Sequence, residues 1–402
     1  MRKGKGLPQA TQAILSSALF FIELNSSIAL HFVCYSSSKL NQLLGAWVAS
    51  SCAAAHIRKA YAFSDDLKVA MKHLLIKTLA AAMAVATLGA ASAQERTLKF
   101  ATQNPVGHPI VTGMEAFKKA VEEKSAGKIK VSLFPGGTLG SDQANISALQ
   151  GGTIEMVSMN SGNFASLAKE FAVYDFPFMF ANTKEADAVV DGPFGKKLHS
   201  KLEAAGVVGL TYFELGFRSM TNSKRPLNTV ADFAGLKIRV IPNPINVAWV
   251  KALDANPTPL PFPEVFAGLE TKAIDGQENP VTVINANRFY EVQRYLTLTN
   301  HQYNPQSVVF SKKVWDTLSA AEKKIIGDAA VDATAAQRKA ARDQVAGAID
   351  NLKKNGMQVN DLPPAEVAKM VAKMSPVITQ FAANVGAETV TELLAELAKV
   401  RK

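Results

Sequence analysis

Stretches in which apolar and polar residues alternate are separated along the chain by stretches with the apolar spacing of a helix. The strand pattern occurs at residues 98–102, 129–133, 154–159 and 207–213, and a short strand is also expected at 308–310. A helical pattern follows each of the first two strands, and the second of these helices is expected to begin with Ser141 or Asp142 as its cap. Strands that alternate with helices predict βαβ units and a largely parallel sheet.

The strand pattern is clearest at residues 236–240, where three aliphatic residues alternate with Lys237 and Arg239. Pro242 ends this strand, and Asn243 is placed to cap a helix that has Pro244 at its first position. Arg239 should therefore lie near a strand end and a helix N-terminus, where open α/β sheets bind ligands and favour anions. Its planar guanidinium matches a carboxylate. The pattern alone also fits a solvated surface arginine.

Seven short motifs surround this strand. They are GFR at 216–218, GLKIRV at 235–240, NPTP at 256–259, FPEV at 262–265, DGQENP at 275–280, FYEVQ at 289–293 and LTNH at 298–301. In these motifs, and from about residue 98 to its end, the chain resembles the DctP family, the solute-binding proteins of tripartite ATP-independent periplasmic (TRAP) transporters.

The resemblance implies a role for several residues of these motifs. It makes Arg239 the main clamp for a ligand carboxylate, Arg218 a second contact, Asn279 a further partner of the same carboxylate, and Phe262 an apolar wall. The DGQENP stretch also fits a tight turn. The sequence IPNP at 241–244 departs from the simpler proline step of many family members, so the pocket role expected of Asn243 stays open.

Polar loops follow the first three strands and are expected to face a cleft. Asn104, Asp142 and Asn163 are the candidates in the loops at 103–104, 141–142 and 160–163. Each loop alone equally fits a turn or a cap. The resemblance implies that these loops touch the far end of the solute and determine specificity.

A capping box of Ser319 and Glu322 precedes an alanine-rich helical pattern that extends to about Asn355. One long helix, or two helices broken near Gly327 or Gly347, would fit this pattern. We expect a two-lobed α/β fold like the type II periplasmic binding proteins, with mostly parallel sheets and hinge strands near 215 and 304. The lobes are predicted at 94–215 plus 304–343 (lobe I) and at 216–303 plus 344–402 (lobe II), braced by the long helix.

Residues 71–93 have the basic start, short apolar core and Ala-Ser-Ala end of a signal peptide, which predicts cleavage after Ala93 and a periplasmic protein. We expect translation to start at Met71 and residues 1–70 to lie outside the natural product; an unusual extension or membrane anchor is the alternative. Both cysteines precede residue 94, which excludes disulfides from the mature chain.

The charge balance also depends on this segment. Nine of the 44 Lys and Arg residues and three of the 34 Asp and Glu residues precede residue 94, which lowers the net charge from +10 to +4. The high basicity of the full chain is therefore no argument for a nucleic-acid partner. It is also no argument for stable membrane insertion of the mature protein.

The sequence has no Walker loop, H-E-x-x-H or G-x-S-x-G motif, so we expect no cofactor, metal or catalytic residue. The predicted function is capture of an organic acid and its delivery to TRAP membrane subunits driven by an ion gradient. A receptor of the same fold that feeds a sensor kinase is the alternative, and a secreted enzyme is a third hypothesis. C4-dicarboxylates, sugar acids, keto acids and aromatic acids all stay open as ligands.

Overall fold

The computed structural model describes residues 95–401. The signal peptide and the upstream segment expected before residue 94 lie outside the described residues. No helix within residues 95–401 combines the length and the apolar composition that a membrane span requires.

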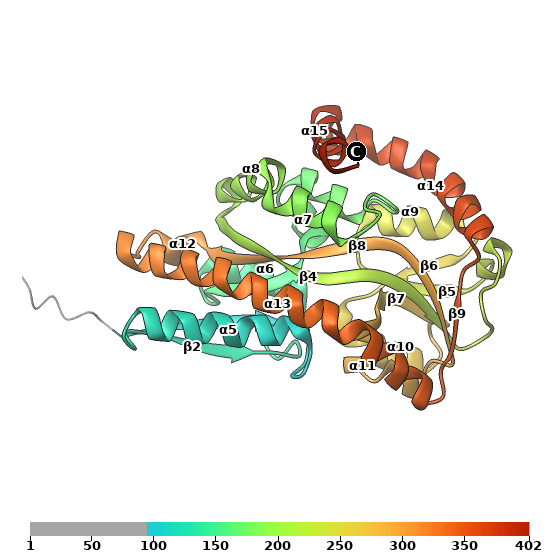
Figure 1. Cartoon of the computed structure of the whole chain (residues 1–402), viewed down its shortest axis with the longest axis horizontal. Helices are drawn as coiled ribbons and strands as arrows, with labels where there is room; N and C mark the ends of the chain where they lie inside the picture. Colours follow the sequence, from blue (N-terminus) through green and yellow to red (C-terminus); the bar gives the residue numbers. More distant parts are fainter. Residues whose placement is uncertain (1–94, 402) are drawn as a thin grey trace, which may run out of the picture. The chain divides into compact units, whose positions relative to one another are not determined.

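The described part of the chain is built around one nine-stranded mixed sheet (Figure 1). The strands are β1 (Arg96–Thr102), β2 (Ile129–Phe134), β3 (Met156–Asn160), β4 (Val207–Asn222), β5 (Lys237–Val240), β6 (Asn256–Pro259), β7 (Gly276–Pro280), β8 (Tyr295–Ser311) and β9 (Gln358–Asp361). Their order is β2-β1-β3-β8-β4-β7-β5-β6, and β9 pairs with β8.

The two ends of the sheet are parallel, as the βαβ pattern predicts. β1 runs parallel to β2 and β3, and β5 runs parallel to β6 and β7. The carboxyl ends of β1 and β3 therefore meet in one half of the sheet and those of β5 and β7 in the other, which is where an α/β sheet presents ligand-binding loops.

The long antiparallel strands β4 and β8 join these two halves. They span 16 and 17 residues, much more than the expected strands at 207–213 and 308–310. The remaining positions escaped the strand pattern because many of their polar residues, such as Ser219 and Gln302, are fully buried. Their pairing shifts register between Glu214 and Gly216 and again between Arg218 and Met220, so the irregular part of the ladder lies near the expected hinge.

Helices cover both faces of the sheet. They are α5 (Pro109–Lys124), α6 (Asp142–Gly151), α7 (Thr183–Asp191), α8 (Pro193–Lys201), α9 (Pro244–Ala252), α10 (Val265–Glu270), α11 (Val281–Ala286), α12 (Lys312–Trp315), α13 (Ala320–Lys354), α14 (Pro364–Val385) and α15 (Ala387–Val400). Ser141 caps α6 and Asn243 caps α9, both as expected, since each side chain accepts a hydrogen bond from the first turn.

The long helix α13 is a single helix of 35 residues, not two. Ser319 and Glu322 form the expected capping box, and each side chain accepts a hydrogen bond from the backbone N–H of the other residue. The helix crosses one face of the sheet, packing on α5, β4 and α11 (Figure 1). It therefore contacts both halves of the sheet, as a bracing element would.

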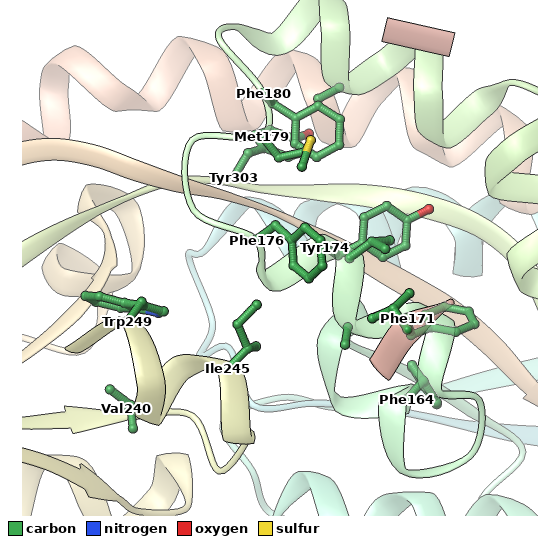
Figure 2. Close-up of a cluster of buried hydrophobic side chains, with 14 of the residues drawn as sticks. Phe164, Phe171, Tyr174, Phe176, Met179, Phe180, Val240, Ile245, Trp249 and Tyr303 are labelled. Atoms are coloured by element: carbon green, nitrogen blue, oxygen red, sulfur yellow. The ribbon is translucent and has the colours of Figure 1, made fainter. Parts of the chain in front are cut away.

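The other face of the sheet carries the largest hydrophobic cluster. Aromatic residues between 164 and 180 pack there with Ile245 and Trp249 of α9 (Figure 2). The last two helices follow this face: α14 packs on α9, and α15 packs on α7 and α8. Since α7 and α8 fall in the expected lobe I, the C-terminal segment expected in lobe II extends over both halves.

Candidate ligand-binding site

The site is a cavity between the two halves of the sheet. Its lining residues are Gln103, Asn104, Asp142, Met159, Asn160, Leu215, Arg218, Arg239, Ile241, Phe262, Asn279, Val283 and Gln306. A second, outer cavity shares Asp142, Arg239, Ile241 and Phe262 with it and extends to Asn163 and Asn243. The inner cavity has a volume of about 40 Å³ and the outer cavity about 360 Å³. The outer cavity is therefore the one that reaches the size of small-molecule pockets, about 300–1,000 Å³.

Arg239 lies on β5 and is only 2% exposed. Its Nε donates to the Leu260 carbonyl at 2.9 Å, while its Nη1 is buried without a partner. The Phe262 ring centroid lies 5.8 Å from the guanidinium carbon and supports the cation from one side. Burial lowers the pKa of Arg239 to about 10, so the side chain stays charged at neutral pH. A buried cation with an unpartnered N–H group in a cavity is suited to hold an anion.

Arg218 lines the same cavity but is already paired. Its guanidinium forms a two-pronged ion pair with Glu278, with Nη2 at 2.8 Å from Oε1, and its Nη1 donates to Asn304 Oδ1 at 2.8 Å. Both members of the pair are about 1% exposed. Burial, the largest single influence, opposes ionisation of Glu278, but the Arg218 charge and the hydrogen bonds from His301 and Arg218 together outweigh it and hold the pKa of Glu278 at about 2. The charge of Arg218 is therefore largely balanced within the protein.

Asn279 and Phe262 complete the side of the cavity around Arg239. Asn279, on β7, is 3% exposed, and its Nδ2 donates to Gln277 Oε1. This bond uses one N–H of the amide, and Asn279 is part of the cavity wall. Phe262 begins a 3₁₀ turn ahead of α10 and contributes a partly buried ring.

The opposite wall comes from the loops after β1, β2 and β3, as the sequence suggests. Asp142, the first residue of α6, accepts a hydrogen bond from Asn163 at 2.9 Å through Oδ2, while its Oδ1 is buried without a partner. Burial raises the pKa of Asp142 to about 6, against the opposing effect of the Arg239 charge. Asn104 is also in the wall, and its Nδ2 is held by Thr102 Oγ1 at 3.1 Å.

Two residues of these loops, Gln103 and Asn160, belong to the cavity although neither is among the candidates chosen from the sequence. Gln103 is 8% and Asn160 is 6% exposed. Gln103 donates to the Gly140 carbonyl at 2.8 Å, which leaves Oε1 unpartnered, and Asn160 has neither amide atom paired. The sequence signal that could have identified them is their position at strand ends, Gln103 after β1 and Asn160 at the end of β3.

Asn243 lies only on the outer cavity, and its polar atoms are engaged within the protein. Its Oδ1 caps α9, and its Nδ2 donates to Asp175 Oδ2 at 2.7 Å. Asp175 is fully buried, and Gln302 and Asn246 also reach it. Sequence reasoning missed Asp175 because its neighbours, in the run YDFPF, are mainly apolar.

Apart from Gln306, whose Oε1 accepts a hydrogen bond from Ser158 at 2.8 Å, the remaining lining is apolar, from Met159, Leu215, Ile241 and Val283. These residues look like ordinary core positions in the sequence, so no local signal assigns them to a ligand cavity. Residues 95–401 hold no group of three acidic or histidine side chains arranged to hold a metal ion.

A two-lobed α/β fold with a buried arginine in a cavity between its halves defines a solute-binding protein. The chain belongs to the DctP family, because the model of the bacterial extracellular solute-binding proteins, family 7, matches residues 100–384.

Solved structures and a characterised relative agree with this assignment. A TRAP periplasmic solute-binding protein from Ochrobactrum anthropi, with its C-terminus bound in the ligand-binding pocket, is 52% identical with a TM-score of 0.70, covering 77% of this chain and 97% of that one. The sugar acid binding protein DctPAm of Advenella mimigardefordensis, in complex with galactonate, is 42% identical with a TM-score of 0.75, covering 76% and 99%. The 2,3-diketo-L-gulonate-binding periplasmic protein YiaO of Escherichia coli is 38% identical, covering 68% and 84%.

Proposed function

We propose that this protein captures an organic acid in the inner cavity and the outer cavity that adjoins it, with Arg239 as the carboxylate anchor, and delivers it to the membrane subunits of a TRAP transporter. The single observation that carries the proposal is the buried guanidinium of Arg239, which lines both cavities and whose Nη1 has no partner. The relatives support it, since galactonate and 2,3-diketo-L-gulonate, named for two of them, are both carboxylic acids.

The other residues take graded roles in this proposal. Asn279 bonds the same carboxylate, and Phe262 packs on both ligand and arginine. Arg218 acts mainly by position: its pair with Glu278 fixes the wall beside the ligand, and it offers the carboxylate less charge than Arg239 does. Asn104, Asp142 and Asn163 contact the far end of the ligand. No residue is assigned a catalytic role, because the function of the family is solute capture.

Closure would bring the lobe I loops onto a ligand held by Arg239. We place the bend in β4, where the register shifts between Glu214 and Gly216 and where Gly216 has a φ of 112°. The lobes are those expected from the sequence, with the C-terminal helices bridging them. Export to the periplasm through residues 71–93, with cleavage after Ala93, belongs to the same proposal.

The test replaces the anchor and measures binding by isothermal titration calorimetry. Arg239→Ala should weaken binding of the acid by about 2–5 kcal/mol, because the ligand carboxylate would be buried without its cation. Lys237→Ala is the matched control, since Lys237 is an exposed cation two residues away on the same strand. Galactonate is the first ligand and its methyl ester the negative control. Unchanged affinity in Arg239→Ala would show that the carboxylate anchor is elsewhere.

A further inference from the structure

The polar atoms that lack partners are concentrated in one place. Among the described residues, twelve buried side-chain nitrogen or oxygen atoms have no hydrogen-bond partner, and five of them belong to residues that line the inner cavity. These are Gln103 Oε1, Asp142 Oδ1, Asn160 Oδ1, Asn160 Nδ2 and Arg239 Nη1. A buried polar atom without a partner is costly, so a ligand that pairs these atoms is favoured over one that leaves them unpaired.

The two sides of the cavity differ in the hydrogen-bonding roles of these five atoms. Arg239 supplies a cationic donor, whereas the opposite wall, formed by Gln103, Asp142 and Asn160, presents three acceptor oxygens and one donor. Acceptor oxygens are satisfied only by a ligand that brings N–H or O–H groups. A carboxylate brings none, but a hydroxyl group donates and accepts. A ligand with one carboxylate at Arg239 and hydroxyl groups along the rest of its length would satisfy this wall.

The charges around the cavity give a second, independent constraint. The cationic side chains in the lining are Arg218 and Arg239, and Arg218 is balanced by Glu278. The opposite wall carries Asp142 and no cation. A second carboxylate on the ligand would therefore face an acidic side chain in a buried site, where like charges destabilise binding strongly.

We propose, building on the function above, that the cavity selects a polyhydroxy monocarboxylic acid of the sugar-acid type and that Asp142 is the residue that excludes diacids. Gln103, Asn160 and Asp142 accept the ligand hydroxyl groups, and Arg239 holds its one carboxylate. Asp142 thus acts twice, as a hydroxyl acceptor and as a charge that a second carboxylate cannot approach.

The test separates hydroxyl groups from charge with four six-carbon acids. D-galactonate has one carboxylate and hydroxyl groups, galactarate has two carboxylates and hydroxyl groups, hexanoate has one carboxylate alone, and adipate has two carboxylates alone. Four- to six-carbon aldonates of other configuration are included, and the tightest of them represents the first class. Titration calorimetry on the purified protein, unfolded and refolded to remove any bound acid, gives the four affinities.

The aldonate should bind tightest, with hexanoate at least about 100-fold weaker, because a site built for hydroxyl groups rejects analogues that lack them. Galactarate should also be at least about 100-fold weaker than the aldonate. Asp142→Asn keeps the size and removes the charge, so it should reduce the preference for the aldonate over galactarate at least about tenfold. Glu264→Gln makes the same charge change on an exposed residue outside the cavity lining and should leave that preference unchanged.

The outcomes distinguish the inference from the function on which it rests. Binding of hexanoate or adipate as tight as that of the aldonate, lost in Arg239→Ala, would overturn the hydroxyl inference and keep the proposed function. A preference for the aldonate over galactarate that Asp142→Asn leaves unchanged would overturn the role of Asp142. Binding of none of these acids, with binding of a keto or aromatic acid that Arg239→Ala abolishes, would overturn the inference and keep the proposed function. No binding of any of these classes of acid would refute both.

Discussion

Removal of the Arg218 side-chain charge should destabilise the fold strongly, because Arg218 is the buried ion-pair partner of Glu278. Arg218→Met would leave the Glu278 carboxylate about 1% exposed, with His301 at 3.3 Å as its remaining side-chain partner within 4 Å. Loss of one partner of a buried ion pair costs about 3–5 kcal/mol. The pKa of Glu278 gives a consistent figure: a value held at about 2 against an ordinary 4.5 corresponds to roughly 3 kcal/mol.

Urea denaturation at pH 7 measures this loss. Arg96→Met is the matched control, because its pair with Glu322 is 24–30% exposed and should contribute less than about 1 kcal/mol. The double variant Arg218→Met/Glu278→Gln should recover most of the stability, since no uncompensated charge remains. A single variant within about 1 kcal/mol of the wild type, or a double variant no better than the single, would refute the buried-pair argument.

The pH dependence has a definite sign. The folded protein holds the pKa of Glu278 below its ordinary value, so the stability that the ionised carboxylate contributes is complete above pH 4.5. That contribution is lost as the pH falls toward 2. The stability difference between the wild type and Arg218→Met should therefore narrow below pH 4.5, which the same urea curves at pH 3 and pH 7 would measure.

Two further variants examine the buried network around Asp175. Burial raises the pKa of Asp175 to about 6, so the stability that the protonated carboxyl group contributes is complete below pH 4 and is lost as the pH rises through 6. In urea denaturation the wild type should therefore lose up to roughly 3 kcal/mol relative to Asp175→Asn between pH 4 and pH 7. Parallel pH profiles of the two proteins would contradict this. In Gly162→Ala the new Cβ would lie 2.0 Å from Asp175 Oδ2, so thermal denaturation should show a loss of about 1–3 kcal/mol. Gly347→Ala in α13 meets no atom within 4 Å and should be neutral or slightly stabilising, and equal losses in both variants would contradict the steric argument.

The elements predicted best from the sequence are those with local signals. The caps at Ser141, Asn243 and Ser319 are confirmed because an N-cap involves residues within one turn of each other. The placement of Arg239 on a strand beside a helix N-terminus follows from the same local patterns. The loops after β1, β2 and β3 meet at the cavity because parallel strands bring their carboxyl ends together.

The elements predicted worst are those whose environment depends on distant residues. β4 and β8 are longer than expected because each buries polar residues against partners on other elements. Arg218 pairs with Glu278, 60 positions away, and Asn243 with Asp175, 68 positions away. No period or spacing in the sequence specifies such a pair, and an aspartate in an aromatic run gives no sign that it holds a buried network together.

The contrast between Arg218 and Arg239 shows what this limit means for function. Both are arginines in strand-like motifs, and by resemblance both are candidates for the ligand carboxylate. In the structure one guanidinium is matched by a buried carboxylate, whereas the other has an unpartnered nitrogen in the cavity. A ligand is attracted by the uncompensated charge and not by the number of arginines. A site that seems from its sequence to offer two cations therefore offers one, and with Asp142 opposite it favours an acid with a single carboxylate.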